Sequence, residues 1–156
     1  MLAETNLSNW RQATKAAHQA LAHQAHTEAL QHFLTAVHEA EQLLLHRAED
    51  LPTPRIYGFT CQCLVNCYRR LGQMEQAFST VQRAYWRLVD IIEDPCLPEV
   101  LRRNGLAELR HHLVPALNFL QQWPEGVVES QRLLNHAHTL TVRRFGVAPA
   151  PNVTRH

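Results

Sequence analysis

The sequence is poor in several residue types and patterns, and each shortage excludes a class of protein. Only five of the 156 residues are glycine while 46% are hydrophobic, which excludes a disordered chain. The formal net charge of +1 gives the whole chain no attraction for nucleic acid or an anionic membrane. No apolar run approaches the roughly 18 residues of a spanning helix. Residues 1–10 lack the basic start and apolar block of an export signal. We therefore expect no membrane partner.

The four cysteines do not resemble a disulfide framework. Cys61, Cys63 and Cys67 fall close together on one expected helix, where neighbouring side chains point apart and do not bridge easily. Free thiols are typical of a reducing compartment. The cysteine usage therefore favours a cytoplasmic protein.

Apolar residues recur at three- and four-residue steps along nearly the whole chain, which is the period of amphipathic helices. No stretch alternates with period two for long enough to be a strand. We therefore predict an all-α protein with six helices, paired as antiparallel hairpins at about 8–48, 55–93 and 98–145 within a single domain, 1–146. Residues 147–156 have turn chemistry without periodicity and are expected to be a flexible tail.

Proline and glycine mark the expected helix boundaries. Pro52 and Pro54 disfavour helical conformation just before them and end the second helix. Gly72 is expected to close the third helix as a left-handed cap. Pro115 falls inside the fifth helix, where we expect a kink or a local loosening.

The second hairpin contains a spaced pattern of small and large residues. In order, it reads Cys61, Leu64, Val65, Tyr68, Leu71 and Gly72, then Ala77, Val81 and Ala84. This pattern resembles a tetratricopeptide repeat, in which alanines let two helices approach and larger residues fill the groove between them. The first hairpin shares Ala29, Phe33 and Ala36 on its second helix, but Gln24 stands where the turn glycine is usual.

The spacing of the hairpins departs from that family. Ala29 and Ala77 lie 48 residues apart, whereas the family repeats about every 34 residues. The second helix of the first hairpin is therefore expected to be extended. The third hairpin matches in length and spacing alone. The resemblance implies a short right-handed superhelix whose first helices line a concave groove for an extended peptide or a partner helix.

The resemblance assigns a binding role to polar residues on the groove side of the first helices. Here they are Arg11, Lys15, His18, Gln62, Asn66, Arg69 and Arg70. Asn66 falls where peptide-binding members hold a ligand carboxylate, but Gln62 replaces the companion lysine, so a full carboxylate clamp is not expected. The groove is basic, and arginine forks bind carboxylates. We therefore expect a non-enzymatic adaptor or scaffold that binds an acidic peptide or partner helix.

A metal-binding or thiol-bearing helical bundle is the alternative. Cys63 and Cys67 lie four residues apart, and His23 and His26 lie three apart, so each pair shares a helix face and could ligate zinc or copper(I). No CxxC pair accompanies them, so we expect no cofactor.

Motifs for catalysis and for nucleic acid are missing from the sequence. There is no Gly-rich phosphate loop, zinc-protease motif or nucleophile elbow, so we expect no enzyme. The arginines of the last third lack aromatic interleaving and a recognised motif, so no nucleic-acid partner is expected.

The fourth helix has extra apolar residues, which either lie between neighbouring helices or form a homodimer patch. They are Phe78, Tyr85, Trp86, Val89 and an isoleucine.

Overall fold

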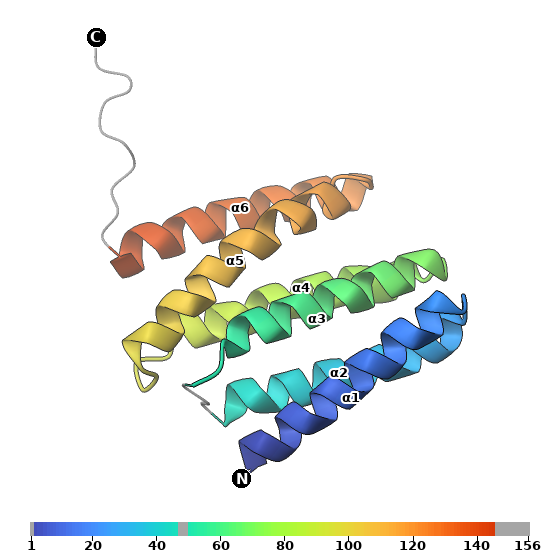
Figure 1. Cartoon of the computed structure of the whole chain (residues 1–156). Helices are drawn as coiled ribbons and strands as arrows, with labels where there is room; N and C mark the ends of the chain where they lie inside the picture. The colour runs from blue at the N-terminus through green and yellow to red at the C-terminus, as the bar shows by residue number, and fades with distance from the viewer. Residues whose placement is uncertain (1, 47–49, 146–156) are drawn as a thin grey trace. The chain divides into compact units, whose positions relative to one another are not determined.

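The computed structural model of the chain describes residues 2–46 and 50–145. Within these ranges the chain forms six helices and no strand, which confirms the predicted all-α class. The helices are α1 (Leu2–Ala22), α2 (His26–Leu45), α3 (Thr53–Arg70), α4 (Met74–Glu93), α5 (Glu99–Leu120) and α6 (Pro124–Phe145) (Figure 1). The predicted tail at 147–156 lies outside the described residues.

The contacts divide the chain into two compact units, Met1–His112 and Leu113–His156, and the division falls inside α5. In the first unit, α1 packs on α2, α2 on α3 and α3 on α4, as expected for consecutive helical hairpins. The prediction of a single domain stays a prediction. α5 continues through Pro115, where the sequence indicated a kink or a loosening.

The first helix starts earlier than the sequence indicated. We expected the first hairpin to begin near residue 8, because the apolar stripe starts only at Trp10, yet α1 begins at Leu2. Its first turns carry the half-buried Ala3 and Leu7, and the Asn6 side-chain amide donates to the Glu39 carboxylate of α2 over 2.6 Å. Ala3, Leu7 and Trp10 are spaced by four and three positions, so the apolar stripe extends further toward the N-terminus than we expected.

The turns of the first two hairpins have the same backbone geometry. Gly72 follows α3 with φ of 72°, which confirms the predicted left-handed cap, and Gln24 follows α1 with φ of 58°. The next N–H donates to a carbonyl five residues back in both turns, over 2.8 Å in the first and 2.9 Å in the second. The two turns lie 48 residues apart, so this offset relates equivalent positions of the first two hairpins.

The core of these hairpins combines alanines with a few large side chains. Tyr57, Phe33 and Leu88 are among the largest fully buried residues. Six alanines have no exposed surface, and small side chains at such positions allow helices to approach closely. They are Ala17, Ala29, Ala36, Ala40, Ala77 and Ala84.

A polar contact fixes α1 beside α3, which runs in the same direction (Figure 1). The Trp10 indole N–H donates to the Thr60 hydroxyl over 2.9 Å. That hydroxyl in turn donates to the Ile56 carbonyl over 2.6 Å, so both polar groups of this buried contact are satisfied.

The first part of α5 packs against both α3 and α4. Gly105 lies against Ile91 and Ile92, and a Cβ at Gly58 would collide with the Glu108 side chain. Buried Arg102 donates through Nε to the Ile92 carbonyl over 2.9 Å, so this arginine fixes a helix contact.

Two of the extra apolar residues of α4 are buried. Tyr85 and Val89 have 0% and 3% of their surface exposed, and the Tyr85 ring meets the half-buried Trp86 edge-on at 5.0 Å. Their burial favours the interpretation that these residues lie between neighbouring helices.

Within the described ranges, no helix is both long enough and apolar enough to cross a bilayer.

The buried His112 should make stability depend on pH. Its Nε2 lies 3.4 Å from the Val81 carbonyl oxygen. Burial lowers the pKa of His112, and the Val81 carbonyl opposes that effect. Below about pH 6.5 the unfolded chain therefore binds the proton more readily than the folded chain. The His112 contribution to stability is complete above that pH and is lost as the pH falls toward the lowered value.

We expect the free energy of unfolding of His112→Gln to fall less steeply than that of the wild type between about pH 6.5 and 5. Urea denaturation at stepped pH measures this difference. His111→Gln is the matched control, because His111 is the exposed neighbour. Equal slopes for wild type and His112→Gln would disprove the assignment.

Candidate functional site

One face of α3 stays uncovered within the first unit. Thr60 on one side of the helix contacts α1, and Gly58 on the other side lies against Glu108 of α5. The residues between these two sides are spaced by four, three and four positions, so they form one stripe. They are the exposed Phe59, Asn66 and Arg70 and the half-buried Cys63. Phe59 has 51% of its surface exposed, which is unusual for an aromatic side chain at the centre of a helix face.

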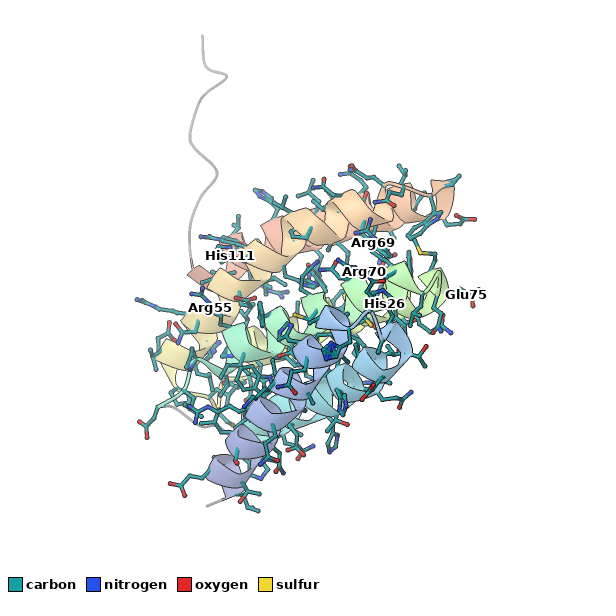
Figure 2. All side chains as sticks on the ribbon, turned by 45° about the vertical axis from the view of Figure 1, so that its right-hand side comes forward. His26, Arg55, Arg69, Arg70, Glu75 and His111 are labelled. Carbon is teal, nitrogen blue, oxygen red and sulfur yellow. The ribbon has the colours of Figure 1, made fainter. Side chains whose placement is uncertain are left out.

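The C-terminal end of this stripe opens into a shallow depression. Asn66, Arg69, Arg70 and Met74 line it, and Figure 2 shows both arginines at the end of α3. Cations at the last turn of a helix also interact favourably with its dipole, which stabilises the arginines in place. The structure therefore brings together three of the residues that the sequence indicated. Gln62 is half-buried at the edge of the stripe.

The predicted residues of α1 form a stripe along that helix. Arg11, Lys15 and His18 are all exposed. α1 and α3 run in the same direction from the Trp10–Thr60 contact. Because both helices rise equally per residue, Lys15 and His18 lie at the same distance along α1 from this contact as positions 65 and 68 lie along α3. The His18 ring also meets Phe33 edge-on at 5.5 Å, so packing helps to orient it.

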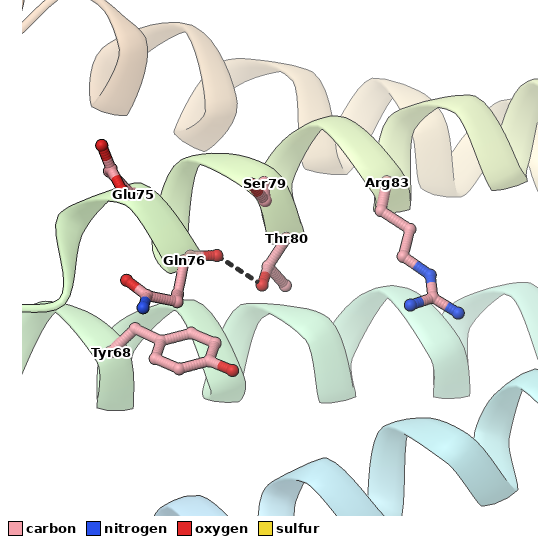
Figure 3. A pocket seen from close by; sticks show the side chains of 6 residues that line it. All are labelled: Tyr68, Glu75, Gln76, Ser79, Thr80 and Arg83. Carbon is pink, nitrogen blue, oxygen red and sulfur yellow. Dashed lines mark hydrogen bonds between the residues drawn. The ribbon is translucent and has the colours of Figure 1, made fainter.

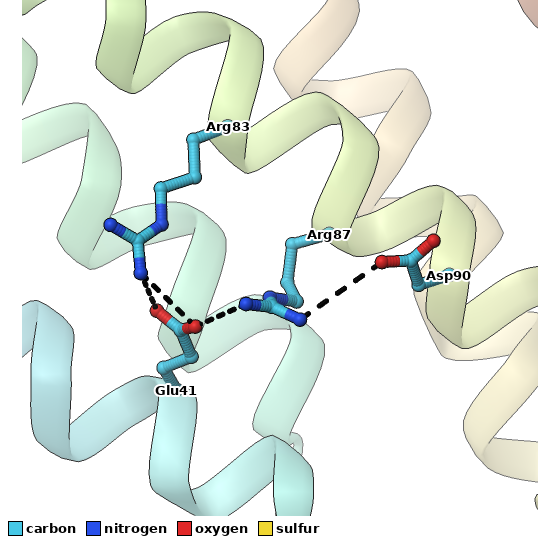
Figure 4. Close-up of polar contacts among 4 residues, drawn as sticks. All are labelled: Glu41, Arg83, Arg87 and Asp90. Atoms are coloured by element: carbon cyan, nitrogen blue, oxygen red, sulfur yellow. Dashed lines mark hydrogen bonds and ion pairs between the residues drawn. The ribbon is translucent and has the colours of Figure 1, made fainter.

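A buried acid on α2, which the sequence analysis did not identify, links the first two hairpins. The Glu41 side chain is only 10% exposed and lies opposite two arginines of α4 (Figure 4). Arg83 Nη2 contacts both carboxylate oxygens, at 3.2 and 2.9 Å, and Arg87 Nη2 donates to one of them. Arg87 also lies 4.0 Å from Asp90. Both carboxylate oxygens therefore accept from guanidinium donors.

This ion-pair network borders a pocket between α2, α3 and α4. The pocket has a volume of about 220 Å³, and an adjoining one of about 310 Å³ continues along α4. Tyr68, Thr80 and Arg83 line both, and Figure 3 shows these side chains between α3 and α4. The first pocket is lined by Leu34, Val37, His38, Glu41, Tyr57, Cys61, Leu64, Tyr68, Thr80 and Arg83. We call it the α2–α3–α4 pocket.

The floor of the α2–α3–α4 pocket contains two neutral ionisable groups. Burial raises the pKa of the Cys61 thiol to about 12, and burial likewise raises the pKa of the Tyr57 hydroxyl. Neither group is charged near pH 7. The Tyr57 hydroxyl is buried and has no hydrogen-bond partner of ordinary geometry among the described residues.

The offset of 48 residues provides a signal that could have revealed Glu41. The equivalent position on α4 is Val89, which is 3% exposed. An acid therefore stands where the other hairpin has a core valine. A glutamate at a core position requires a partner, and Arg83 and Arg87 lie one helical turn apart on the facing helix.

The cysteines and histidines considered for metal binding do not converge. Cys67 donates to the backbone carbonyl of His26 over 3.4 Å, and burial raises the pKa values of Cys63 and Cys67. Across residues 2–46 and 50–145, no three His, Cys, Asp or Glu side chains gather in a way that could hold a metal ion.

A family model described as a protein of unknown function, DUF2753, matches residues 8–145. The chain belongs to the DUF2753 family. Comparison with curated proteins and with solved structures found no match. The DUF2753 match includes the uncovered face of α3, Glu41 and its arginines, so both features lie within the family region.

We expect Glu41→Gln to lower the free energy of unfolding by about 1–3 kcal/mol. The amide loses the charge that two guanidinium groups contact, and the exposure of Arg83 moderates the cost through solvent screening. Urea denaturation measures the change. Glu28→Gln is the control, because its side chain is 68% exposed, and a similar loss in both variants would contradict the role of the network.

Proposed function

We propose that this DUF2753 chain is a non-enzymatic protein-interaction module, similar to tetratricopeptide repeats, that binds an acidic segment of a partner protein. The observation that carries the proposal is the exposed Phe59 on the same stripe as Asn66 and Arg70. The four free cysteines support our placement of the protein in the cytoplasm.

The hairpin geometry supports the resemblance to that repeat family. The first two hairpins share a left-handed turn residue and the same hydrogen bond at an offset of 48 residues. Fully buried alanines occur on the helices of both hairpins, where small side chains allow close approach. In a stack of this type the first helix of each hairpin presents a face to a ligand, and here those helices are α1 and α3.

The chemistry of the stripe fits an acidic segment that contains one apolar residue. Arginine forks form charge-assisted hydrogen bonds with carboxylates, and the Asn66 amide can donate a further one. An exposed aromatic residue can bury an apolar side chain of the partner, as anchors at the centre of interfaces do. Lys15 and Arg11 of the neighbouring helix add to the positive charge.

The test uses a fluorescein-labelled, glutamate-rich peptide with one central leucine, measured by fluorescence anisotropy. We expect saturable, salt-sensitive binding that the double variant Arg69→Glu/Arg70→Glu weakens at least tenfold, because two attractive charges become repulsive. A peptide with lysine in place of glutamate should not bind.

The matched control is Arg103→Glu/Arg110→Glu, which reverses two exposed charges of α5 within the first unit. It should retain binding. If the Arg69/Arg70 double variant binds the acidic peptide as tightly as this control, the proposed face is wrong.

The anchor role of Phe59 has its own test. We expect Phe59→Ser to weaken peptide binding several-fold with little change in melting temperature, because half of the side chain is already in water. Replacement of the peptide's leucine by serine should cause a similar loss in the wild-type protein. No further loss is expected when both changes are combined.

A further inference from the structure

We propose that Arg55 and Glu108 form one end of the peptide-binding stripe on α3, and that Glu108 makes the stripe bind an acidic segment more tightly as the pH falls. This regulation depends on the proposed function, because it acts on the same site. It is carried by the place of one half-buried acid beside the stripe, and by the two basic residues that act on that acid.

Arg55 continues the stripe toward the start of α3. It lies four residues before Phe59, so the two side chains leave the helix on the same face, and both are exposed. Figure 2 shows Arg55 at the opposite end of α3 from Arg69 and Arg70. An acidic segment that follows the stripe from Arg70 past Phe59 therefore comes to Arg55.

Glu108 of α5 lies against the α3 backbone beside this end of the stripe. A Cβ at Gly58 would collide with the Cγ, Cδ and Oε1 atoms of Glu108, so the missing side chain at Gly58 is what lets the carboxyl lie there. Burial raises the pKa of Glu108, and His111 and Arg55 oppose that effect. A half-buried acid with a raised pKa therefore borders the basic stripe.

The charged groups that act on Glu108 come from two helices. Arg55 acts from α3, and His111 acts from one turn further along α5. His112, the next residue, is buried and faces α4 instead. α4 meets this part of α5 through apolar side chains, those of Ile91 and Ile92. The ionised Glu108 carboxyl therefore offsets part of the positive charge that Arg55 brings to the stripe.

Proton uptake by Glu108 favours an acidic ligand for two reasons. The neutral carboxyl no longer repels the ligand's carboxylates, and it no longer offsets the charge of Arg55. A bound acidic segment in turn raises the pKa of Glu108 further, because the ionised form then faces more negative charge. Binding is therefore coupled to proton uptake, and the affinity rises as the pH falls through the pKa of Glu108 in the complex toward its pKa in the free chain.

The experiment is isothermal titration calorimetry of the full chain with an aspartate-rich peptide that contains one central leucine. Aspartate has a lower ordinary pKa than glutamate, so the peptide keeps its charge between about pH 7.5 and about pH 5.5. Titrations in two buffers of different ionisation enthalpy count the protons that binding takes up. Histidines also gain charge in this range, so the titrations are repeated in the double variant His18→Gln/His111→Gln, which replaces two exposed side chains.

In the double variant we expect the affinity to rise about threefold or more over this pH range, with net proton uptake on binding. Adding Glu108→Gln should raise the affinity at neutral pH and remove most of the remaining pH dependence, because the amide takes up no proton. Its melting temperature should match or exceed that of the double variant, since a half-buried carboxylate is removed. Adding Glu28→Gln instead removes an exposed acid of α2, and this control should change neither quantity.

A second measurement observes the acid in the absence of peptide. The side-chain carboxyl-carbon NMR signal of Glu108 reports its protonation. We expect its midpoint to lie at a higher pH in the wild type than in Gly58→Ala, because the added methyl group displaces the carboxyl toward water. Bound peptide should move the wild-type midpoint to a still higher pH.

The outcomes separate the regulation from the proposed function. If the peptide binds and Arg69→Glu/Arg70→Glu weakens it, but Glu108→Gln leaves affinity and proton uptake unchanged, the role of Glu108 is wrong and the proposed function stands. Equal NMR midpoints in the wild type and Gly58→Ala would also overturn that role. If the wild type binds the peptide at neither pH, the proposed function is wrong and the regulation fails with it.

Discussion

The close approach of helices at fully buried alanines is the constraint on which the first unit depends. Ala17, Ala29 and Ala77 have no exposed surface, and any larger side chain there would push the helix pairs apart. Their small size brings α1 onto α2 and α3 onto α4. Large side chains such as Tyr57 and Leu88 then fill the space between hairpins. Both the uncovered face of α3 and the α2–α3–α4 pocket take their positions from this spacing.

Much of the architecture could be predicted because helices and their caps depend on local patterns of residues. Three- and four-residue apolar steps gave the helices, and a glycine at 72 gave the left-handed cap. The start of α1 was missed although Ala3 and Leu7 continue the spacing from Trp10, because polar residues separate them and a polar contact between Asn6 and Glu39 joins them in holding the first turns. Gln24 shows a related limit, because a left-handed residue without glycine has no distinctive sequence signal.

The residues of the candidate sites also differ in whether local patterns could predict them. Asn66, Arg69 and Arg70 were predictable, because helical spacing alone decides which residues share a face, and they line one depression. Glu41 was not, because a search for apolar stripes passes over an acid within one. Its burial depends on Arg83 and Arg87 from a helix about 40 residues further on, and periodicity carries no information about such a pairing. The clue in the sequence was the offset of 48 residues, which makes Val89 the equivalent of Glu41 in the second hairpin.

The polar contacts between hairpins also have a consequence for the order of folding. Trp10 and Thr60 are 50 positions apart, and Glu41 lies 42 and 46 positions from its two arginines. Each hairpin can close through contacts between adjacent helices, whereas these bonds require two hairpins to meet. Short-range contacts generally form before long-range ones, because closing a longer loop costs more chain entropy. We therefore expect the hairpins to assemble early and these bonds to select the correct docking register in a later, slower step.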